Sequence, residues 1–188
     1  MANHDKLPGF SFFNDAFREE IKRYSTSDYY HNGGFKYALL GSCVNFSNIK
    51  EKWDNANKSI NYVECHDNAT LFDFVNKEVG NIANEDNRLR IQNLINAAVV
   101  VAPGIPFFHA GQEIGITKYG KDNTYNLGDD YNRFPYDVLE ERESMAEYLG
   151  SLANWKRTNP LYETMSSKEL SSKISFDEFD HCIVMKIK

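Results

Sequence analysis

The chain has 188 residues, which suits one domain, or one domain and part of another. Its 21 Lys and Arg residues are outnumbered by 27 Asp and Glu residues, so the formal net charge is −6. Proteins that bind the phosphate backbone of nucleic acids need an excess of cations, so this balance argues against that class. Hydrophobic residues make up 41% of the sequence, enough for a core, which argues against a wholly disordered chain.

The three cysteines, Cys43, Cys65 and Cys182, are odd in number and form no C-x-x-C motif. This argues against a disulfide framework and a zinc site, and favours a cytoplasmic protein, with secretion as the alternative. No basic segment followed by an apolar one opens the sequence, so we expect no signal peptide here. The longest apolar run, residues 97–102, is far shorter than the roughly 18 residues that span a membrane.

The first half of the chain alternates strand-like and helix-like segments. Asn14 or Asp15 can cap a helix in which Phe17 and Ile21 lie four residues apart, as on one amphipathic face. The predicted segments are a strand over 9–13, a helix from about residue 15, a long polar connection over 24–58 with one helix around 36–44, a strand over 60–65, and one or two helical turns over 70–77.

The strongest helix prediction covers residues 86–101. Asp86 is a suitable N-cap, and Pro103-Gly104 would end the helix. Its apolar side chains recur at i, i+3 and i+4, namely Ile91, Leu94, Ile95, Ala98, Val99 and Ala102.

The second half continues with a short apolar segment, residues 105–108, as expected for a strand covered by helices on both faces. The remaining predictions are a helix over 138–157, which has Met145, Leu149 and Leu152 on its apolar side and is ended by Pro160, and a hairpin with strands over 173–176 and 181–187 joined by an acidic turn.

Three successive strand–helix units favour a parallel α/β sheet or barrel over an all-α or sandwich fold. In such folds the ligand lies outside the carboxyl ends of the strands. Polar residues follow each predicted strand at that point, so we expect them to converge at one face. This pattern indicates carboxylate chemistry or the binding of a polar ligand, and does not decide between them. The three polar clusters are Asn14-Asp15, His66-Asp67-Asn68 and Gln112-Glu113.

Residues 62–68 (YVECHDN) resemble the fourth signature region of the α-amylase superfamily, glycoside hydrolase family 13, in which a His-Asp pair ends barrel strand seven. With the following TLFD they are most similar to type I pullulanases. Other segments agree in order and spacing, so the resemblance covers nearly the whole chain. Residues 12–18 (FFNDAFR) resemble the strand-six segment, residues 104–113 (GIPFFHAGQE) the strand-eight motif, and Thr117-Lys118, Asn123-Thr124-Tyr125 and Asp129-x-x-Asn132 the loop after it.

The resemblance implies a partial (β/α)8 TIM barrel over residues 1–158, containing strands six to eight with their helices. The first strands of a C-terminal β-sandwich domain would follow over residues 159–188. The family's nucleophile motif, G-F-R-x-D, does not occur in the 188 residues, and neither does the D-x-x-x-N-H of the first region or the motif of the Glu general acid. We therefore expect a piece of a longer enzyme that is inactive on its own.

Retaining glycoside hydrolysis uses two carboxyl groups about 5–5.5 Å apart, one as nucleophile and one as acid and base. The resemblance implies that Asp67 is a third acid, which stabilises the transition state, and that His66 donates a hydrogen bond to the same sugar. An ionised carboxylate only accepts hydrogen bonds, which suits it to sugar hydroxyls. The alternative interpretation is that Asp67 caps the following helix and that His66 is a buried, hydrogen-bonded histidine.

The resemblance implies further substrate contacts at Asn68, Asn14, Tyr125, Asp129 and Asn132. Asn68 is equally suited to structural support, and Asn14 to a capped helix start.

Four other groups of residues have structural interpretations. Asp15 and Arg18 suit an ion-paired helix start as well as a sugar contact, and the family counterpart of Glu113 is usually interpreted as structural. Trp53 could stack on a sugar, but packing is favoured. The acidic residues at 140, 141 and 143 are most simply a solvated helix face.

Our hypothesis is part of a retaining, endo-acting hydrolase of α-1,6-glucosidic bonds in α-glucans such as pullulan and branched dextrins. The alternatives are a non-catalytic α-glucan-binding or structural module, and another family 13 activity. No cofactor or metal is expected: family members often bind calcium, but no spacing here matches a calcium loop. We expect neither nucleic acid nor a membrane as partner, and self-association through the open sheet edges of a half-barrel.

Overall fold

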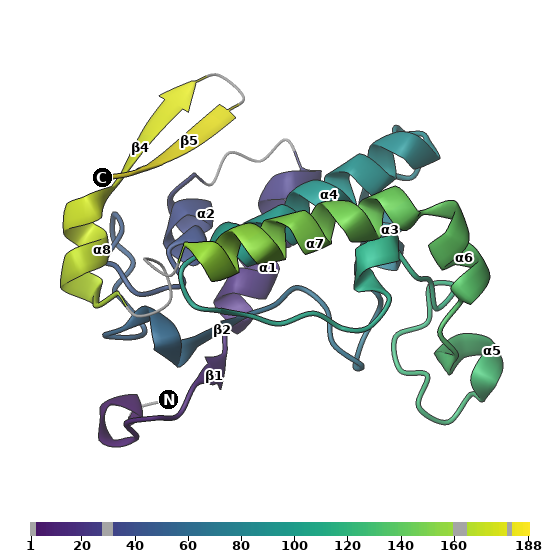
Figure 1. The fold of residues 1–188 in the computed structure, drawn as a ribbon, viewed down its shortest axis with the longest axis horizontal. Helices are drawn as coiled ribbons and strands as arrows, with labels where there is room; N and C mark the ends of the chain where they lie inside the picture. Colours follow the sequence, from purple (N-terminus) through teal and green to yellow (C-terminus); the bar gives the residue numbers. More distant parts are fainter. Residues whose placement is uncertain (1–2, 28–31, 160–164, 180–181) are drawn as a thin grey trace.

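The computed structural model describes residues 3–27, 32–159, 165–179 and 182–188. Its fold is mixed α/β, as predicted (Figure 1). A parallel sheet has the order β1 (Phe12–Phe13), β2 (Ser59–Asn61), β3 (Ile105–Pro106), and β4 (Ile174–Phe179) pairs antiparallel with β5 (Cys182–Ile187). The helices are η1 (His4–Lys6), α1 (Asp15–Thr26), α2 (Asn32–Leu39), η2 (Ala56–Lys58), α3 (Leu71–Val79), α4 (Glu85–Val101), η3 (Gln112–Ile114), α5 (Asp129–Asn132), α6 (Tyr136–Glu141), α7 (Glu143–Thr158) and α8 (Ser167–Lys173).

The first strand–helix unit forms, although β1 covers only residues 12–13 of the strand predicted over 9–13. Oδ1 of Asn14 accepts a hydrogen bond from the amide of Phe17 at 3.2 Å and so caps α1. The Asn14 side-chain amide also donates to the hydroxyls of Ser42, at 3.0 Å, and Ser59, at 2.9 Å. Phe17 and Ile21 are fully buried. One asparagine thus fixes the start of α1 against two distant segments.

The helix predicted around 36–44 lies earlier, as α2, and ends at Leu39. Gly41 and Ser42 follow with φ of 64° and 58°, a left-handed backbone that stops the helix. A Cβ at position 41 would lie 2.6 Å from the carbonyl oxygen of Pro103, so only glycine fits there.

The strands β2 and β3 are also shorter than predicted. β2 ends at Asn61 and β3 at Pro106, which pair with each other. Proline has no amide hydrogen to donate, so the ladder weakens at this pair. Ile105 is 41% exposed, so the prediction that helices cover both faces of this strand is wrong for the described residues.

The predicted helix over 86–101 forms as α4 with two corrections. Its N-cap is Asn84, whose Oδ1 accepts from the amide of Asn87 at 2.9 Å, not Asp86. Ile95 and Val99 are buried as expected, but Leu94 is 61% exposed. The short helix predicted over 70–77 is α3.

The helix predicted over 138–157 is two helices, α6 and α7, which meet at Arg142. The Arg142 guanidinium donates to the carbonyls of Ile114 and Gly115 at 2.9 and 3.0 Å, and to Glu85 at 2.7 Å. These tertiary contacts accompany a non-helical backbone, with φ −120° and ψ 26°. On the predicted apolar side of α7 only Met145 is buried. Pro160 lies outside the described residues.

The C-terminal hairpin forms, but β4 runs to Phe179, so Asp177 and Glu178 of the predicted acidic turn lie in the strand and pair with β5. His181 lies outside the described residues. The helix before it, α8, was not predicted. Ser166 and Glu169 form a capping box at its start, in which each side chain bonds the other residue's backbone amide. The S-x-x-E spacing is visible in the sequence and could have predicted this helix.

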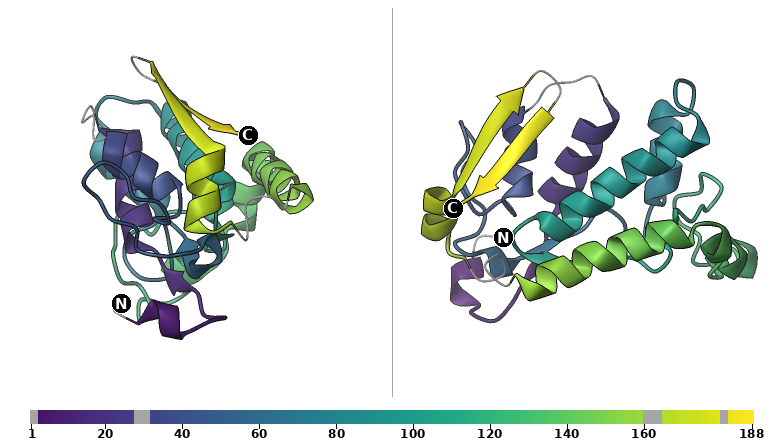
Figure 2. Two further views of the ribbon diagram at one scale, coloured as in Figure 1. Left: turned by 90° about the vertical axis from the view of Figure 1, so that its left-hand side faces the viewer. Right: turned by 45° about the horizontal axis from the view of Figure 1, so that its top comes forward.

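The long helices α4 and α7 run side by side, with the hairpin and α8 at one end of the molecule and α5 and α6 at the other (Figures 1 and 2). Nζ of Lys156 on α7 donates to the carbonyls of Val100 and Ala102 at 2.9 and 2.6 Å. Lys156 is buried, and it satisfies carbonyls that the end of α4 leaves without a partner inside the helix. Within the described ranges, no helix has both the length and the apolar character needed to cross a membrane.

Candidate functional site

The turn formed by His66, Asp67 and Asn68, here called the 66–68 turn, links the segment after β2 to α3. The His66 and Asp67 side chains are 82% and 63% exposed, with His66 Nε2 at 3.4 Å from Asp67 Oδ1. Thr70, not Asp67, caps α3: its hydroxyl accepts from the amide of Asp73 at 3.1 Å. The interpretation of Asp67 as a cap and His66 as a buried histidine is therefore wrong. Both side chains are available to a ligand.

Asp67 and Asn68 border a hollow of about 540 Å³, a size typical of small-molecule sites. Three cationic residues also line it, namely Arg18 and Lys22 of α1 and Lys77 of α3. The hollow therefore holds cations as well as the Asp67 carboxylate of the 66–68 turn. Burial lowers the pKa of Lys22, whose ammonium lies 4.7 Å from the centre of the Phe74 ring. The hollow thus offers both hydrogen-bond donors and acceptors, as a polyhydroxylated ligand requires.

A hydrogen-bonded chain from α1 supports the segment that leads into the turn. The hydroxyl of Tyr62 donates to Asp15 Oδ1 at 2.5 Å and accepts from Arg18 Nη1 at 2.9 Å. Burial, followed by the bond to Asp15, raises the pKa of Tyr62, so its hydroxyl stays protonated at neutral pH. Asp15 and Arg18 are thus joined through the Tyr62 hydroxyl, and the ion pair of Arg18 is with Glu19, at 2.7 Å. Both residues support the segment before the turn, and Arg18 also lines the hollow.

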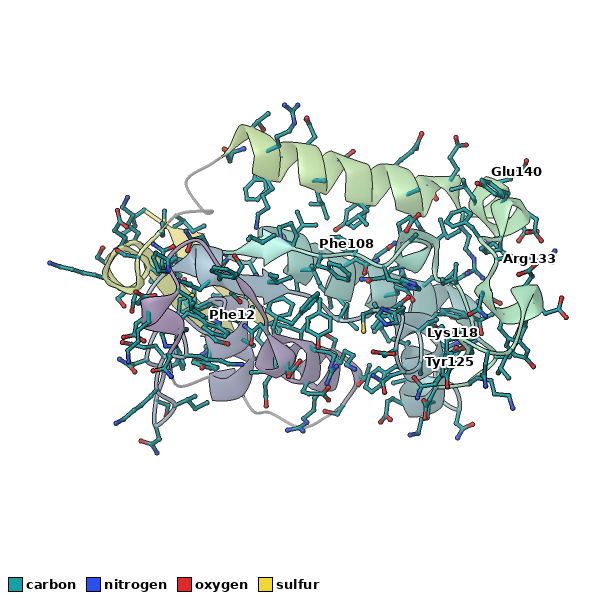
Figure 3. The ribbon with its side chains drawn as sticks, turned by 90° about the horizontal axis from the view of Figure 1, so that it is seen from below. Phe12, Phe108, Lys118, Tyr125, Arg133 and Glu140 are labelled. Atoms are coloured by element: carbon teal, nitrogen blue, oxygen red, sulfur yellow. The ribbon has the colours of Figure 1, made fainter. Side chains whose placement is uncertain are left out.

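Lys118 also supports the 66–68 turn. Figure 3 shows Lys118 at the end of the molecule that also carries the labelled Tyr125 and Arg133. Its ammonium is buried and donates to the main-chain carbonyls of His66 at 2.7 Å and Asn68 at 3.2 Å. The Lys118 amide donates to Asp73 Oδ2 at 2.8 Å, and the Thr117 hydroxyl donates to Asp73 Oδ1 at 2.5 Å. A carboxylate at the start of α3 thus anchors the lysine that holds the turn.

A second buried acid lies beneath the turn. Glu64 accepts from the amide of Leu71 at 2.7 Å, and its other oxygen lies 2.7 Å from Nδ1 of His109. His109, His66 and Lys118 line a smaller hollow of about 170 Å³, which Asn132 and Arg133 also border. Glu64 therefore ties the start of α3 to the segment after β3.

The other predicted site residues differ in exposure and in hydrogen bonding. Asn68 adopts a left-handed backbone, φ 64°, which asparagine tolerates. Asn14 is completely buried and serves the fold, so its prediction as a substrate contact is corrected. Tyr125 is 86% exposed, and Asp129 opens α5 on the surface. The Asn132 side chain bonds to the Thr124 hydroxyl and carbonyl and to the Gly128 carbonyl, so it shapes the loop that carries Tyr125.

The residues with structural interpretations keep them. Glu113 Oε2 accepts a hydrogen bond from the amide of Gly111 at 2.8 Å. Trp53 is 1% exposed and stacks on Phe12, with the two ring centres 5.5 Å apart. The side chains of Glu140, Glu141 and Glu143 face solvent. Within the described part of the chain, no group of three or more His, Cys, Asp or Glu residues could hold a metal ion.

Sequence reasoning missed the supporting residues Lys118, Asp73, Glu64 and His109. All four belong to the quoted segments, but nothing in the sequence indicates that the Lys118 ammonium turns inward to main-chain carbonyls. Asp73 and Glu64 look like ordinary surface acids, because their partners lie 45 residues further along the chain.

The chain matches curated proteins and solved structures over almost its full length. It is 28% identical to a pullulanase of Bacillus subtilis over 99% of this chain and 26% of that protein. A pullulanase variant of Paenibacillus barengoltzii, crystallised with maltotetraose, superposes with a TM-score of 0.91 and 26% identity, over 99% of this chain and 30% of that one. The chain is homologous to pullulanases.

This homology confirms the resemblance read from the motifs. A rice isoamylase is also similar, with 27% identity over 79% of this chain and 22% of that protein. No family model matches the sequence. The pullulanase-like chain spans about a quarter of the length of the Bacillus subtilis relative.

Proposed function

We propose that this chain is part of a retaining debranching glycoside hydrolase that cleaves α-1,6-glucosidic bonds in α-glucans such as pullulan and branched dextrins. The observation that carries the proposal is the exposed His66-Asp67 pair beyond a parallel strand, in a chain homologous to pullulanases. In the proposed enzyme, Asp67 accepts hydrogen bonds from sugar hydroxyls and binds the ring more tightly as positive charge develops in the transition state. His66 donates to the same sugar.

The proposal assigns residues 1–158 to the last portion of a (β/α)8 barrel and residues 159–188 to the start of a β-domain. The parallel order β1-β2-β3 suits barrel strands six, seven and eight. Phe13, Tyr62 and Phe107 form an aromatic cluster with ring centres 5.0–6.4 Å apart, and Phe13 is 47% exposed. In a complete barrel this cluster would face the interior.

The nucleophile and the general acid are assigned to parts of the protein beyond these 188 residues, since their motifs do not occur here. Asn68 and the exposed Tyr125 and Asp129 are proposed to contact glucose units, with Asn132 holding their loop. The partner is therefore an α-glucan. Several solved relatives were crystallised with malto-oligosaccharides, which supports this ligand class.

The test is product analysis with the complete protein and with this chain alone. Maltotriose released from pullulan by the complete protein requires cleavage of α-1,6 bonds and would support the proposal. Panose or isopanose would indicate α-1,4 cleavage and contradict it. Release of maltotriose by the 188-residue chain alone would contradict the placement of nucleophile and acid elsewhere, and would leave Asp15, Glu113 and Asp129 as candidates.

A non-catalytic α-glucan-binding module is the alternative, because the exposed turn and tyrosine also suit binding without turnover. The complete protein would then be retained on a pullulan column and would release no sugar from pullulan.

The isolated chain is also proposed to self-associate. In the described residues, β1 and β3 each have one edge without a partner strand, and such edges pair readily. Sedimentation velocity should show dimers or larger species that increase with concentration. A stable monomer that melts cooperatively at high temperature would contradict this.

A further inference from the structure

We infer that Lys118 is a positioning residue, which holds the 66–68 turn so that the exposed Asp67 carboxylate meets the sugar in one orientation. The inference rests on the proposed function and names a residue that supports its chemistry. The ammonium contacts the carbonyls of His66 and Asn68, the residues on either side of Asp67, and leaves the Asp67 side chain to solvent.

Burying an ammonium costs free energy that only well-formed hydrogen bonds offset. A lysine on a surface loop could reach solvent, yet Lys118 is 4% exposed. Its main chain cannot move aside easily, because the Lys118 amide and the Thr117 hydroxyl both bond to the buried Asp73 carboxylate. Asp73 belongs to α3, which begins three residues after Asn68. A closed ring of hydrogen bonds therefore joins the 66–68 turn, the start of α3 and the loop that carries Lys118.

The turn needs such support, because local interactions do not fix it. Asn68 has a left-handed backbone, and its amide makes only a long contact, 3.4 Å, to Asn123 Oδ1. Cys65 Sγ lies 3.7 Å from the carbonyl of Asp67, a weak contact. Without the ammonium, two inward-facing carbonyls would lose their donor and the turn could rotate. Displacing a catalytic group by about 1 Å is enough to cost roughly 100-fold in rate.

The experiment uses the complete protein and compares Lys118→Met with Lys118→Arg and with Lys156→Met. Lys156 is the matched control, since it is another buried lysine that donates to two carbonyls, at the end of α4 and not at the turn. We expect Lys118→Met to lower kcat on pullulan by roughly 100-fold with KM nearly unchanged, because the lost interaction acts in the transition state. Lys118→Arg keeps a cationic donor and should recover part of kcat. Lys156→Met should keep kcat at temperatures where it is folded.

Amide hydrogen exchange on the same variants separates this inference from the proposed function. Lys118→Met should speed exchange over residues 65–70 and leave residues 98–102 unchanged, and Lys156→Met should do the reverse. Wild-type kcat in a folded Lys118→Met, or an equal loss in Lys156→Met, would overturn the inference while leaving the proposed function intact. A wild-type protein that cleaves no α-glucan would overturn both, whereas unchanged exchange over residues 65–70 would overturn the inference alone.

Discussion

Lys118 and Lys156 are both buried, and each donates hydrogen bonds to two main-chain carbonyls. Their surroundings differ. Lys156 belongs to α7 and donates to the C-terminal carbonyls of the neighbouring helix α4. Lys118 satisfies the carbonyls that flank Asp67, whose side chain faces a hollow and solvent. A buried lysine that donates to two carbonyls therefore caps the end of a helix in one region and holds an exposed turn in the other.

We expect this difference to separate stability from the proposed function. Around Lys156 the two carbonyls belong to Val100 and Ala102, which are themselves buried. Around Lys118 the hydrogen bonds fix the backbone while the polar side chains remain outside. Binding and catalytic groups are commonly carried by loops that a rigid scaffold positions, which is the pattern of the 66–68 turn.

The largest effect on stability is expected from Lys156→Met. Two buried carbonyls of α4 would lose their donor, which should lower the free energy of unfolding by about 2–3 kcal/mol. Urea unfolding followed by circular dichroism measures the change. Lys168→Met, at an exposed position of α8, is the control and should change stability little. A loss as small as that of the control would show that the helix end does not need the ammonium.

A smaller effect is expected from two matched helix caps. Thr70→Ala and Asn84→Ala each remove a side chain that accepts an amide hydrogen bond three residues on, at the starts of α3 and α4. Each should lower stability by about 1 kcal/mol. Thr70→Ala should also lower kcat, because α3 carries the Asp73 carboxylate that anchors Lys118. Equal kcat in the two variants would remove this distinction between the regions.

The smallest perturbation is thiol labelling, which reports how open each region is. Burial raises the pKa of the Cys43 thiol, and Cys43 is 0% exposed within the core. Cys65 lines the hollow beside Asp67 and is partly exposed, and Cys182 is exposed. Iodoacetamide should therefore modify Cys182 and Cys65 in the native protein and leave Cys43 unmodified, as peptide mass spectrometry can determine. Early modification of Cys43 would show that the core opens.

The sequence predicted the parallel strand–helix succession because apolar periodicity and capping residues are local signals. Asn14, Phe17 and Ile21 behave as their spacing indicates. Sequence reasoning failed where contacts between residues far apart in the chain decide the local structure. The break between α6 and α7 falls at Arg142, whose contacts reach Ile114 and Gly115, some 27 residues away. The inward Lys118 side chain is of the same kind, since its partners lie about 50 residues earlier.

The candidate site was predicted at its exposed residues and missed beneath them. His66 and Asp67 follow a predicted strand, where a polar ligand is expected in α/β folds. Asn14 was also placed there, because a polar residue after a strand can either cap the next helix or face a ligand. Only the three-dimensional structure, with Ser42 and Ser59 on the Asn14 amide, decides between these roles.

The most direct test of the account is the kcat of Asp67→Asn in the complete protein acting on pullulan. Asparagine keeps the size of the side chain but loses the negative charge that the developing cation requires. We expect kcat to fall by roughly 10²–10³-fold, since Asp67 is proposed to stabilise the transition state. Thermal stability should be unchanged, because the Asp67 side chain is 63% exposed. A folded Asp67→Asn protein that hydrolyses pullulan at the wild-type rate would contradict the central claim.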